Sequence, residues 1–127
     1  AIWRRLKIME NYSALPDCDW REFCGWLLGR RNRIVVSGLS MLPTLHPKQE
    51  ILCDPRAFQN QDPTPGEIVV IQHPLQPDVQ LVKRVRSQPE PNRFEIQGDN
   101  LAASTDSRDF GLIARSQIVG RVTCLFE

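Results

Sequence analysis

Two loops rich in small and hydroxyl-bearing residues, together with one lysine between them, could hydrolyse a peptide bond. The first loop is Ser37–Leu45, in which Ser40 lies between a glycine and a proline. Gly38 allows the backbone to approach a substrate closely, and Pro43 stiffens the exit from the loop. A nucleophilic serine needs such a fixed, exposed loop, with backbone N–H groups nearby to receive an oxyanion. Taken alone, the segment is also typical of an ordinary turn after a strand.

The lysine is Lys83, in the run Gln80-Leu81-Val82-Lys83-Arg84-Val85, which predicts a strand. Side chains alternate along a strand, so Lys83 shares a face with Leu81 and Val85, and Arg84 points to the other face. A lysine on an apolar face loses solvation, which lowers its pKa, and the neutral amine can take a proton from a serine hydroxyl. The commoner alternative is a lysine that reaches solvent at a sheet edge.

The second loop runs from Gly98 to Gly111 and ends in a hydroxyl-rich segment. A Ser/Lys dyad needs a third group to orient the amine, and Ser104 is our candidate for that role. Asp106 and Arg108 can form an ion pair that fixes the loop. The structural alternative is a serine-rich turn with a salt bridge and no catalytic role.

The elements that must position these residues are mostly strands. Short β-rich runs separated by proline, glycine and asparagine turns predict a compact antiparallel β domain with one short N-terminal helix. We expect one domain over residues 19–127, with its β part at about 33–127, after an N-terminal arm of residues 1–18. The expected strands are Arg33–Val36, Glu50–Asp54, Glu67–Gln72, Gln80–Arg86, Arg93–Gln97 and Ile118–Phe126.

The helix is expected at about residues 19–31. Asp19 can cap it, and Glu22 three residues later completes a capping-box pattern. Its apolar residues recur at helical spacing, so we expect that face to pack on the domain or on a partner. They are Trp20, Phe23, Trp26 and Leu27.

Composition excludes several functions for this chain of 127 residues. A net charge of +1 gives no field that would attract nucleic acid. The apolar stretch at residues 23–28 is far shorter than the ~20 residues that span a bilayer, so we expect a cytoplasmic protein without stable membrane insertion. An amphipathic helix lying on a membrane surface stays open. The sequence does not indicate an oligomeric state.

The cysteines and histidines lack the spacing of metal ligands, so we expect no metal and no cofactor. Cys53 and Cys124 lie in apolar runs and are expected to be small buried hydrophobes. A bridge between Cys18 and Cys24 is possible but has no support in a cytosolic protein.

Together the three segments resemble, in order, the motifs of the signal peptidase I superfamily of serine/lysine proteases. The superfamily includes mitochondrial inner-membrane peptidases and is related to LexA-type autoproteases. The resemblance covers about residues 33–126 and implies a signal peptidase/LexA-like fold. It also implies roles for individual residues: Ser40 as nucleophile, Lys83 as general base, Ser104 as the hydroxyl that positions the lysine, Asp106 and Arg108 as the structural ion pair, the Ser40 N–H and Gly38 at the oxyanion hole, and Met41 and Pro43 in substrate binding.

One small, soluble branch of this superfamily is similar throughout: the nickel-type superoxide dismutase maturation proteases. Segments that look like its members are Leu52-Cys53-Asp54-Pro55, Gln72-His73-Pro74 and Ala102–Arg108. The resemblance implies that the substrate is a nickel superoxide dismutase precursor. The enzyme would remove its N-terminal propeptide, so that the new N-terminus can bind nickel.

Three alternatives remain open. The chain could be a small signal peptidase that acts on membrane preproteins. It could be a non-enzymatic, LexA-like regulatory domain. His73 could replace Lys83 as the base for Ser40.

Overall fold

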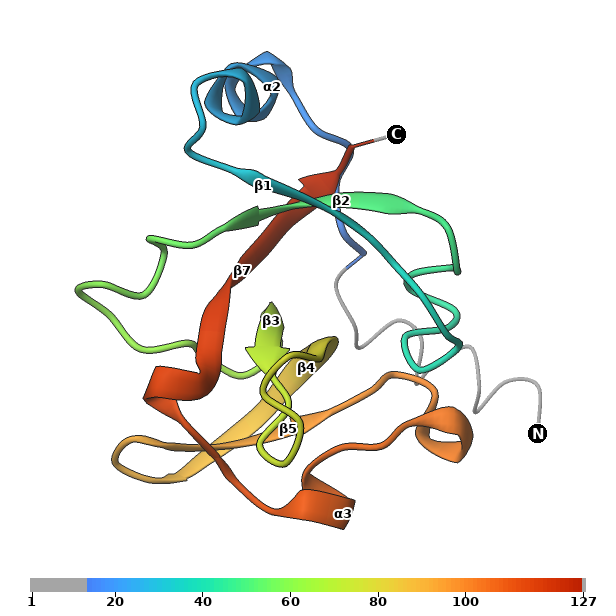
Figure 1. Cartoon of the computed structure of the whole chain (residues 1–127), viewed down its shortest axis with the longest axis vertical. Coiled ribbons are helices and arrows are strands. Elements are labelled where there is room, and N and C mark those ends of the chain that lie inside the picture. Colours follow the sequence, from blue (N-terminus) through green and yellow to red (C-terminus); the bar gives the residue numbers. More distant parts are fainter. Residues whose placement is uncertain (1–13, 127) are drawn as a thin grey trace.

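A computed structural model describes residues 14–126 as one seven-stranded antiparallel sheet that curls on itself (Figure 1). The spatial order is β1-β2-β7-β3-β4-β5-β6. This confirms the predicted fold class, a compact antiparallel β domain with one short helix near the N-terminal end. The strands are β1 (Asn32–Val35), β2 (Glu50–Asp54), β3 (Ile68–Gln72), β4 (Gln80–Glu90), β5 (Arg93–Gln97), β6 (Ile113–Ala114) and β7 (Ile118–Leu125).

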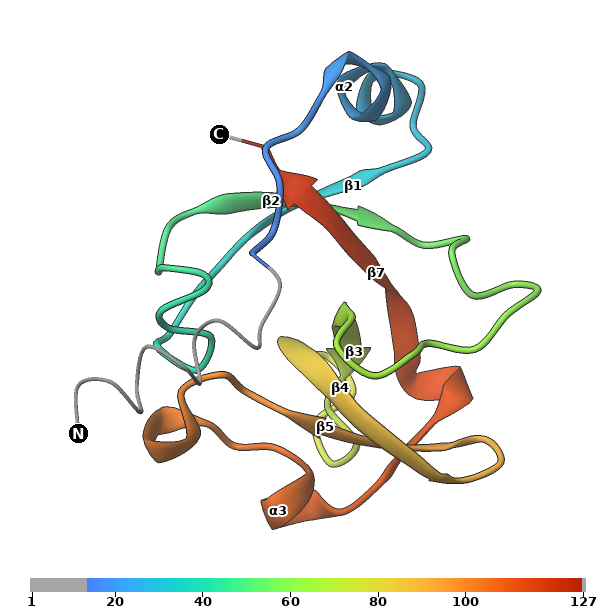
Figure 2. The ribbon, with the colours of Figure 1, turned by 180° about the vertical axis from the view of Figure 1, so that it is seen from behind.

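Strand β3 lies in the middle of the sheet and is buried on both faces. Its alternate residues enter two different cores. Ile68 and Val70 pack with the residues of β2 and of the loop after β1, whereas Val69 and Ile71 pack with β4 and β5. The view from behind shows β3 in the interior of the molecule, between β7 and β4 (Figure 2). A continuous apolar run, rather than an alternating one, is the sequence pattern of such a strand.

Most predicted strands were placed within two residues of their observed bounds, but strand β6, helix α3 and two 3₁₀ helices were not predicted. Strand β4 extends to Glu90 rather than ending at Arg86. Strand β6 is two residues long and exists because Ile113 pairs with Phe94 of β5. The short helix α3 (Ser107–Phe110) lies within the second loop, where only a turn was expected. Elements of this length depend on tertiary contacts, so they leave little periodicity in the sequence.

Helix α2 covers Trp20–Leu27, shorter than the predicted 19–31. Its start agrees with the sequence, because the Asp19 side chain accepts a hydrogen bond from the Glu22 N–H at 3.0 Å. It ends early because Gly29 adopts a φ of 76°, a left-handed conformation that stops an α-helix. Across residues 14–126, none of the helices has the length and apolar character needed to span a bilayer.

The cysteines correct two expectations. Cys18 forms a disulfide with Cys124, not with Cys24, so Cys124 is more than a small buried hydrophobe. The cause is a short parallel bridge between Asp17 and Leu125, which brings the chain before α2 alongside the end of β7. Residues 14–18 are therefore held against the sheet rather than loosely packed. Residues 1–13 of the predicted arm lie outside the described part of the chain.

Candidate active site

Lys83 lies in β4, directly opposite Val69 of β3, and is only 2% exposed. Its face is shared with Val85 in the core, as strand alternation predicted. The Nζ atom donates a hydrogen bond to Ser104 Oγ at 2.9 Å. Burial lowers the pKa of Lys83, and the Arg108 charge lowers it further, against the opposing effect of Asp106. The site therefore favours a neutral amine more than water does.

Ser104 Oγ uses its full hydrogen-bonding capacity. Its hydroxyl donates to Asp106 Oδ2 at 2.7 Å, and its oxygen accepts from Lys83 Nζ and, at 3.1 Å, from the Gly98 N–H. A hydroxyl has one donor and two acceptor sites. Because the proton of Ser104 is committed to Asp106, Ser104 can only accept from Lys83. The lone pair of a neutral Lys83 amine is consequently left for another partner.

Asp106 is fully buried and anchors this arrangement. It forms an ion pair with Arg108 at 3.0 Å and caps α3 by accepting from the Arg108 N–H. Burial alone would raise the pKa of Asp106. Hydrogen bonds from the Arg108 and Ser104 side chains and from the Arg108 and Gly98 N–H groups outweigh burial and lower the pKa to about 2. Asp106 is thus a permanent anion that fixes the orientation of Ser104.

The Ser40 loop is attached to the second loop through its backbone. The Asn100 N–H donates to the Ser40 carbonyl at 2.8 Å, and the Asn100 side-chain amide donates to the Leu39 carbonyl at 3.1 Å. Gly38 has a φ of 78°, a conformation that side-chain-bearing residues rarely adopt. The loop that carries the candidate nucleophile is therefore fixed by the conformation of Gly38 and by the hydrogen bonds to the Leu39 and Ser40 carbonyl groups.

Gly98 is the point at which the two loops meet. A Cβ atom at this position would lie 2.4 Å from Ser104 Oγ and 2.5 Å from the Ser40 carbonyl oxygen. The missing side chain therefore lets Ser40 and Ser104 approach the same small space from two sides. A glycine is required here by space rather than by a positive φ.

A buried ion pair that sequence reasoning did not assign fixes the strand beside the second loop. Arg84 makes two hydrogen bonds to Asp99, each of 2.9 Å, and the pair is almost fully buried. The Thr44 hydroxyl also donates to Asp99. Thus Asp99 joins the residue after Lys83 to the loop of Ser40. Strand alternation could have indicated this pair. A strand buried on both faces directs Lys83 into one core and Arg84 into the other, and a buried guanidinium needs an anionic partner.

A small pocket of about 80 Å³ lies beside Ser40. Met41 lines it from a buried position, whereas Pro43 is exposed and lies outside the lining. Ser40 and Lys83 are both described, and no hydrogen bond joins their side chains. Catalytic hydrogen bonds are often looser without substrate. The remaining pocket walls come from the edge strand β1 and the segment after it and from the central strands β3 and β4: Ile34, Val35, Val36, Ser37, Val70, Gln80, Leu81 and Val82.

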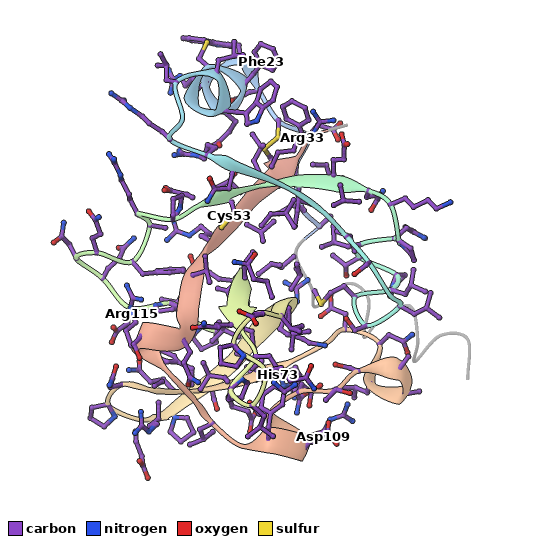
Figure 3. All side chains as sticks on the ribbon, viewed as in Figure 1. Phe23, Arg33, Cys53, His73, Asp109 and Arg115 are labelled. Atoms are coloured by element: carbon purple, nitrogen blue, oxygen red, sulfur yellow. A yellow bond between two sulfur atoms is a disulfide. The ribbon has the colours of Figure 1, made fainter. Side chains whose placement is uncertain are left out.

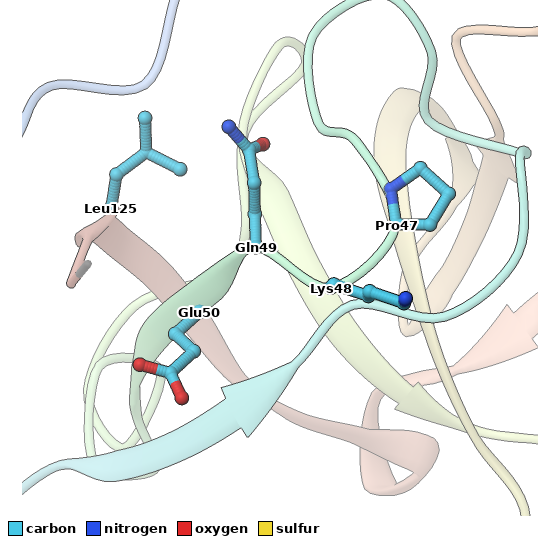
Figure 4. A pocket seen from close by; sticks show the side chains of 5 residues that line it. All are labelled: Pro47, Lys48, Gln49, Glu50 and Leu125. Atoms are coloured by element: carbon cyan, nitrogen blue, oxygen red, sulfur yellow. The ribbon is translucent and has the colours of Figure 1, made fainter.

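Two other features lie apart from this pocket. His73 Nδ1 accepts hydrogen bonds from the Leu75 and Gln76 N–H groups, so this nitrogen is occupied within its own turn. A larger, shallow hollow of about 510 Å³ lies where β2 begins and β7 ends (Figure 4). Its walls are Pro47, Lys48, Gln49, Glu50 and Leu125, and they contain none of the candidate catalytic residues.

The curled sheet and the buried amine beside a serine loop are features of a peptidase of the signal-peptidase type. The comparison with protein families agrees: the family described as "Signal peptidase, peptidase S26" matches residues 31–90 and 89–126. The chain belongs to this family. Its sequence is 32% identical to mitochondrial inner membrane protease subunit 1 of Xenopus tropicalis, over 91% of this chain and 75% of that protein.

A second relative is a plant protein. The chain is 36% identical to mitochondrial ATP-independent inner membrane protease subunit 1b of Arabidopsis thaliana, over 67% of this chain. That match spans 63% of the plant protein, so over a third of the relative lies outside it.

Proposed function

We propose that the chain is a serine endopeptidase in which Ser40 is the nucleophile and Lys83 the general base. The observation that carries the proposal is the chain of hydrogen bonds from Lys83 through Ser104 to Asp106. It holds a buried lysine amine with its lone pair uncommitted, which is the state that a general base requires.

The proposed reaction proceeds through an acyl-enzyme. The neutral Lys83 amine takes the proton of the Ser40 hydroxyl while Oγ attacks the scissile carbonyl carbon. The Ser40 N–H and the backbone at Gly38 stabilise the oxyanion. As the C–N bond breaks, the Lys83 ammonium returns the proton to the leaving amine. Lys83 then takes a proton from water while the hydroxide attacks the ester carbonyl. The Lys83 ammonium returns that proton to Ser40 Oγ as the ester C–O bond breaks and the acid product leaves.

The substrate is proposed to bind in an extended conformation along β1. This strand lies at the edge of the sheet, so its outer backbone groups can pair with another strand. The pocket beside Ser40 is about 80 Å³ and is walled largely by apolar residues. A space of this size suits a small side chain and excludes an aromatic one. The cleavage site should therefore carry a small residue next to the scissile bond.

The proposed substrate is a nickel superoxide dismutase precursor, from which the enzyme would remove the N-terminal propeptide. The support is the resemblance of the segments around Asp54, His73 and Ser104 to the dismutase maturation proteases. The proposed chemistry is carried by a hydroxyl and an amine and includes no step through a metal. Nickel would enter only afterwards, at the new N-terminus of the product.

A membrane preprotein is the second candidate substrate. Both relatives are inner membrane proteases by name, which favours processing at a membrane. The same Ser40 and Lys83 chemistry would serve either substrate, so the two candidates differ only in the protein that is cut.

Co-expression tests the substrate and the chemistry together. The chain would be produced with a nickel superoxide dismutase precursor, and separately with a membrane preprotein, and the intact mass of each precursor measured. We expect a shortened dismutase that is absent with Ser40→Ala and with Lys83→Ala. The matched control is Ser116→Ala, which removes an exposed hydroxyl elsewhere and should leave cleavage unchanged.

Each other outcome removes part of the proposal. Cleavage of the preprotein alone would replace the substrate and keep the chemistry. Full cleavage by Ser40→Ala would remove the chemistry. Two uncut precursors, with no labelling of Ser40 by an acyl-enzyme-forming probe, would favour a regulatory domain of LexA type.

A further inference from the structure

Helix α2 presents its apolar side to solvent. At 100° per residue, five residues fall on one continuous arc: Trp20, Phe23, Cys24, Leu27 and Leu28 of the helix and its C-cap. All five are exposed, with Trp20 at 71%, Leu28 at 70%, Leu27 at 62% and Phe23 at 45%. Single exposed apolar residues are ordinary, but a contiguous apolar ridge marks an interaction site.

The opposite side of α2 is bound firmly to the sheet by polar and aromatic contacts. Glu22 forms an ion pair with Arg31 at 2.8 Å and accepts a hydrogen bond from Thr123 of β7. The Trp26 ring packs edge-on against the Phe126 ring, with 4.8 Å between the ring centres. Figure 3 shows α2 with Phe23 at one end of the molecule, above Arg33 of β1. The Phe23 ring also stacks on Phe126, with 6.1 Å between the ring centres. The helix is thus fixed with Trp20, Leu27 and Leu28 outward.

A disulfide also fixes the position of α2 on the sheet. The Cys18–Cys124 disulfide joins the chain just before α2 to the end of β7. The hydrogen bonds from the Cys18 N–H to the Leu125 carbonyl and from the Leu125 N–H to the Pro16 carbonyl hold the same segment. The outward ridge is therefore built into the fold rather than left by a loosely attached helix.

Two arginines lie beside the ridge. Arg21 lies with its guanidinium 5.6 Å from the centre of the Trp20 ring, and Arg30 follows the helix as an exposed residue. Glu22 faces Arg31 on the side toward the sheet, and Asp19, which is exposed, caps the N-terminal end of the helix. An apolar ridge flanked by arginines is complementary to acyl chains beneath anionic headgroups.

We propose that α2 docks on the surface of an anionic lipid bilayer. Trp20, Leu27 and Leu28 would enter the boundary between headgroups and acyl chains, and Arg21 and Arg30 would contact lipid phosphates. A second copy of the chain fits less well. A helix of eight residues is only ~12 Å long, whereas a stable interface needs roughly 800 Å² from each partner.

Vesicle co-sedimentation of the full chain tests this proposal without using proteolysis. The vesicles would contain phosphatidylcholine with about 30 mol% phosphatidylglycerol, because an anionic surface attracts basic segments. We expect the full chain to bind, and the triple variant Trp20→Ser/Leu27→Ser/Leu28→Ser to bind about tenfold more weakly. Arg21→Gln/Arg30→Gln should weaken binding to these vesicles but not to pure phosphatidylcholine. The matched control is Leu75→Ser, which removes an equally exposed leucine in the turn between β3 and β4.

Other results would overturn the proposal. Absence of binding by the unaltered chain would do so. Equal binding by the triple variant would assign any binding to another segment, for example the sequence Arg4-Arg5-Leu6-Lys7. A dimer in light scattering that the triple variant abolishes, without vesicle binding, would assign the ridge to a second copy. The melting temperature of each variant should stay within a few degrees, because the substituted side chains are exposed.

Discussion

Lys83 and Ser104 are joined by a hydrogen bond that can run in one direction only. Nζ donates to Oγ at 2.9 Å, because the Ser104 proton is held by Asp106 at 2.7 Å. Asp106 is in turn held by Arg108. A hydrogen-bonded chain therefore runs from the exposed Arg108 through Asp106 and Ser104 to the buried amine of Lys83. This amine is the base that we propose for Ser40.

Replacing Ser104 tests its positioning role. Ser104→Ala removes the acceptor that holds Nζ, so we expect cleavage to slow by about 10²- to 10³-fold, within the range of a misplaced general base. Ser104→Thr keeps the hydroxyl and should recover part of the rate. The measurement is kcat and KM on the cleaved precursor. A loss confined to KM would contradict the role, because it would place Ser104 in substrate binding instead.

The pH dependence of cleavage should report Lys83. Burial lowers the pKa of this lysine, and only the neutral amine is a base. We therefore expect kcat/KM to be low at pH values below that lowered pKa and to rise as the pH passes through it. Asp106 raises the pKa of Lys83. Asp106→Asn should therefore shift the rising limb to lower pH, even though the maximal rate also falls. A limb that is unmoved, or moved to higher pH, would show that another group controls it.

Stability in acid should depend on Asp106. Its pKa is lowered from 3.8 to about 2 in the folded chain. The stabilisation is thus fully present above pH 4 and is lost as the pH falls through about 2, because the unfolded chain then binds the proton more readily. Urea unfolding between pH 5 and pH 2 would measure this. Asp106→Asn should be less stable at neutral pH and should show a smaller loss in acid. A parallel loss in both proteins would contradict the assignment.

The buried pair of Arg84 and Asp99 predicts an asymmetric effect of substitution. Replacing either residue takes away the opposite charge that its buried partner contacts, and should cost about 3–5 kcal/mol of unfolding free energy. Arg84→Met/Asp99→Leu removes both charges and should be more stable than either single variant. Denaturant unfolding of the three variants provides the comparison. Additive losses in the double variant would mean that the two side chains do not depend on each other.

Gly98 predicts a steric effect on the site. Gly98→Ala would place a Cβ against the Ser40 carbonyl, which is backbone and cannot turn aside. We expect cleavage to be lost to a greater degree than stability, because the loops that carry Ser40 and Ser104 are forced apart. Gly25→Ala is the matched control: its Cβ would meet only the flexible Arg31 side chain at 3.3 Å. Retention of the full rate by Gly98→Ala would contradict the close approach of the loops.

The sequence predicted the parts of this molecule that have local signals. Asp19 marked the start of α2, and the apolar runs around Ile51, Val69 and Phe94 marked strands. The partners of side chains were harder to predict, since they depend on the fold. The Cys18–Cys124 bond needs the chain before α2 to lie beside β7, and the contact between Arg84 and Asp99 needs β4 to lie beside the second loop.

The periodicity of the sequence also could not predict which side of α2 faces solvent. The helical apolar repeat predicted one face with Trp20, Phe23, Trp26 and Leu27, but it did not show that Trp26 packs on Phe126 while Trp20 and Leu27 stay exposed. The polar contacts of Glu22 with Arg31 and Thr123 decide the orientation, and they join residues up to 101 positions apart. Long-range polar pairs of this kind are invisible to a pattern of local spacing.

The most direct test of the central claim is the rate of precursor cleavage by Lys83→Arg. Arginine keeps the positive charge and much of the length of the lysine, but it stays protonated at any pH that the fold survives. If Lys83 acts as a neutral base toward Ser40, Lys83→Arg should leave a folded chain with no measurable cleavage between pH 6 and pH 10. Cleavage within tenfold of the unaltered chain would show that Lys83 contributes only charge or packing, and the proposed dyad would be wrong.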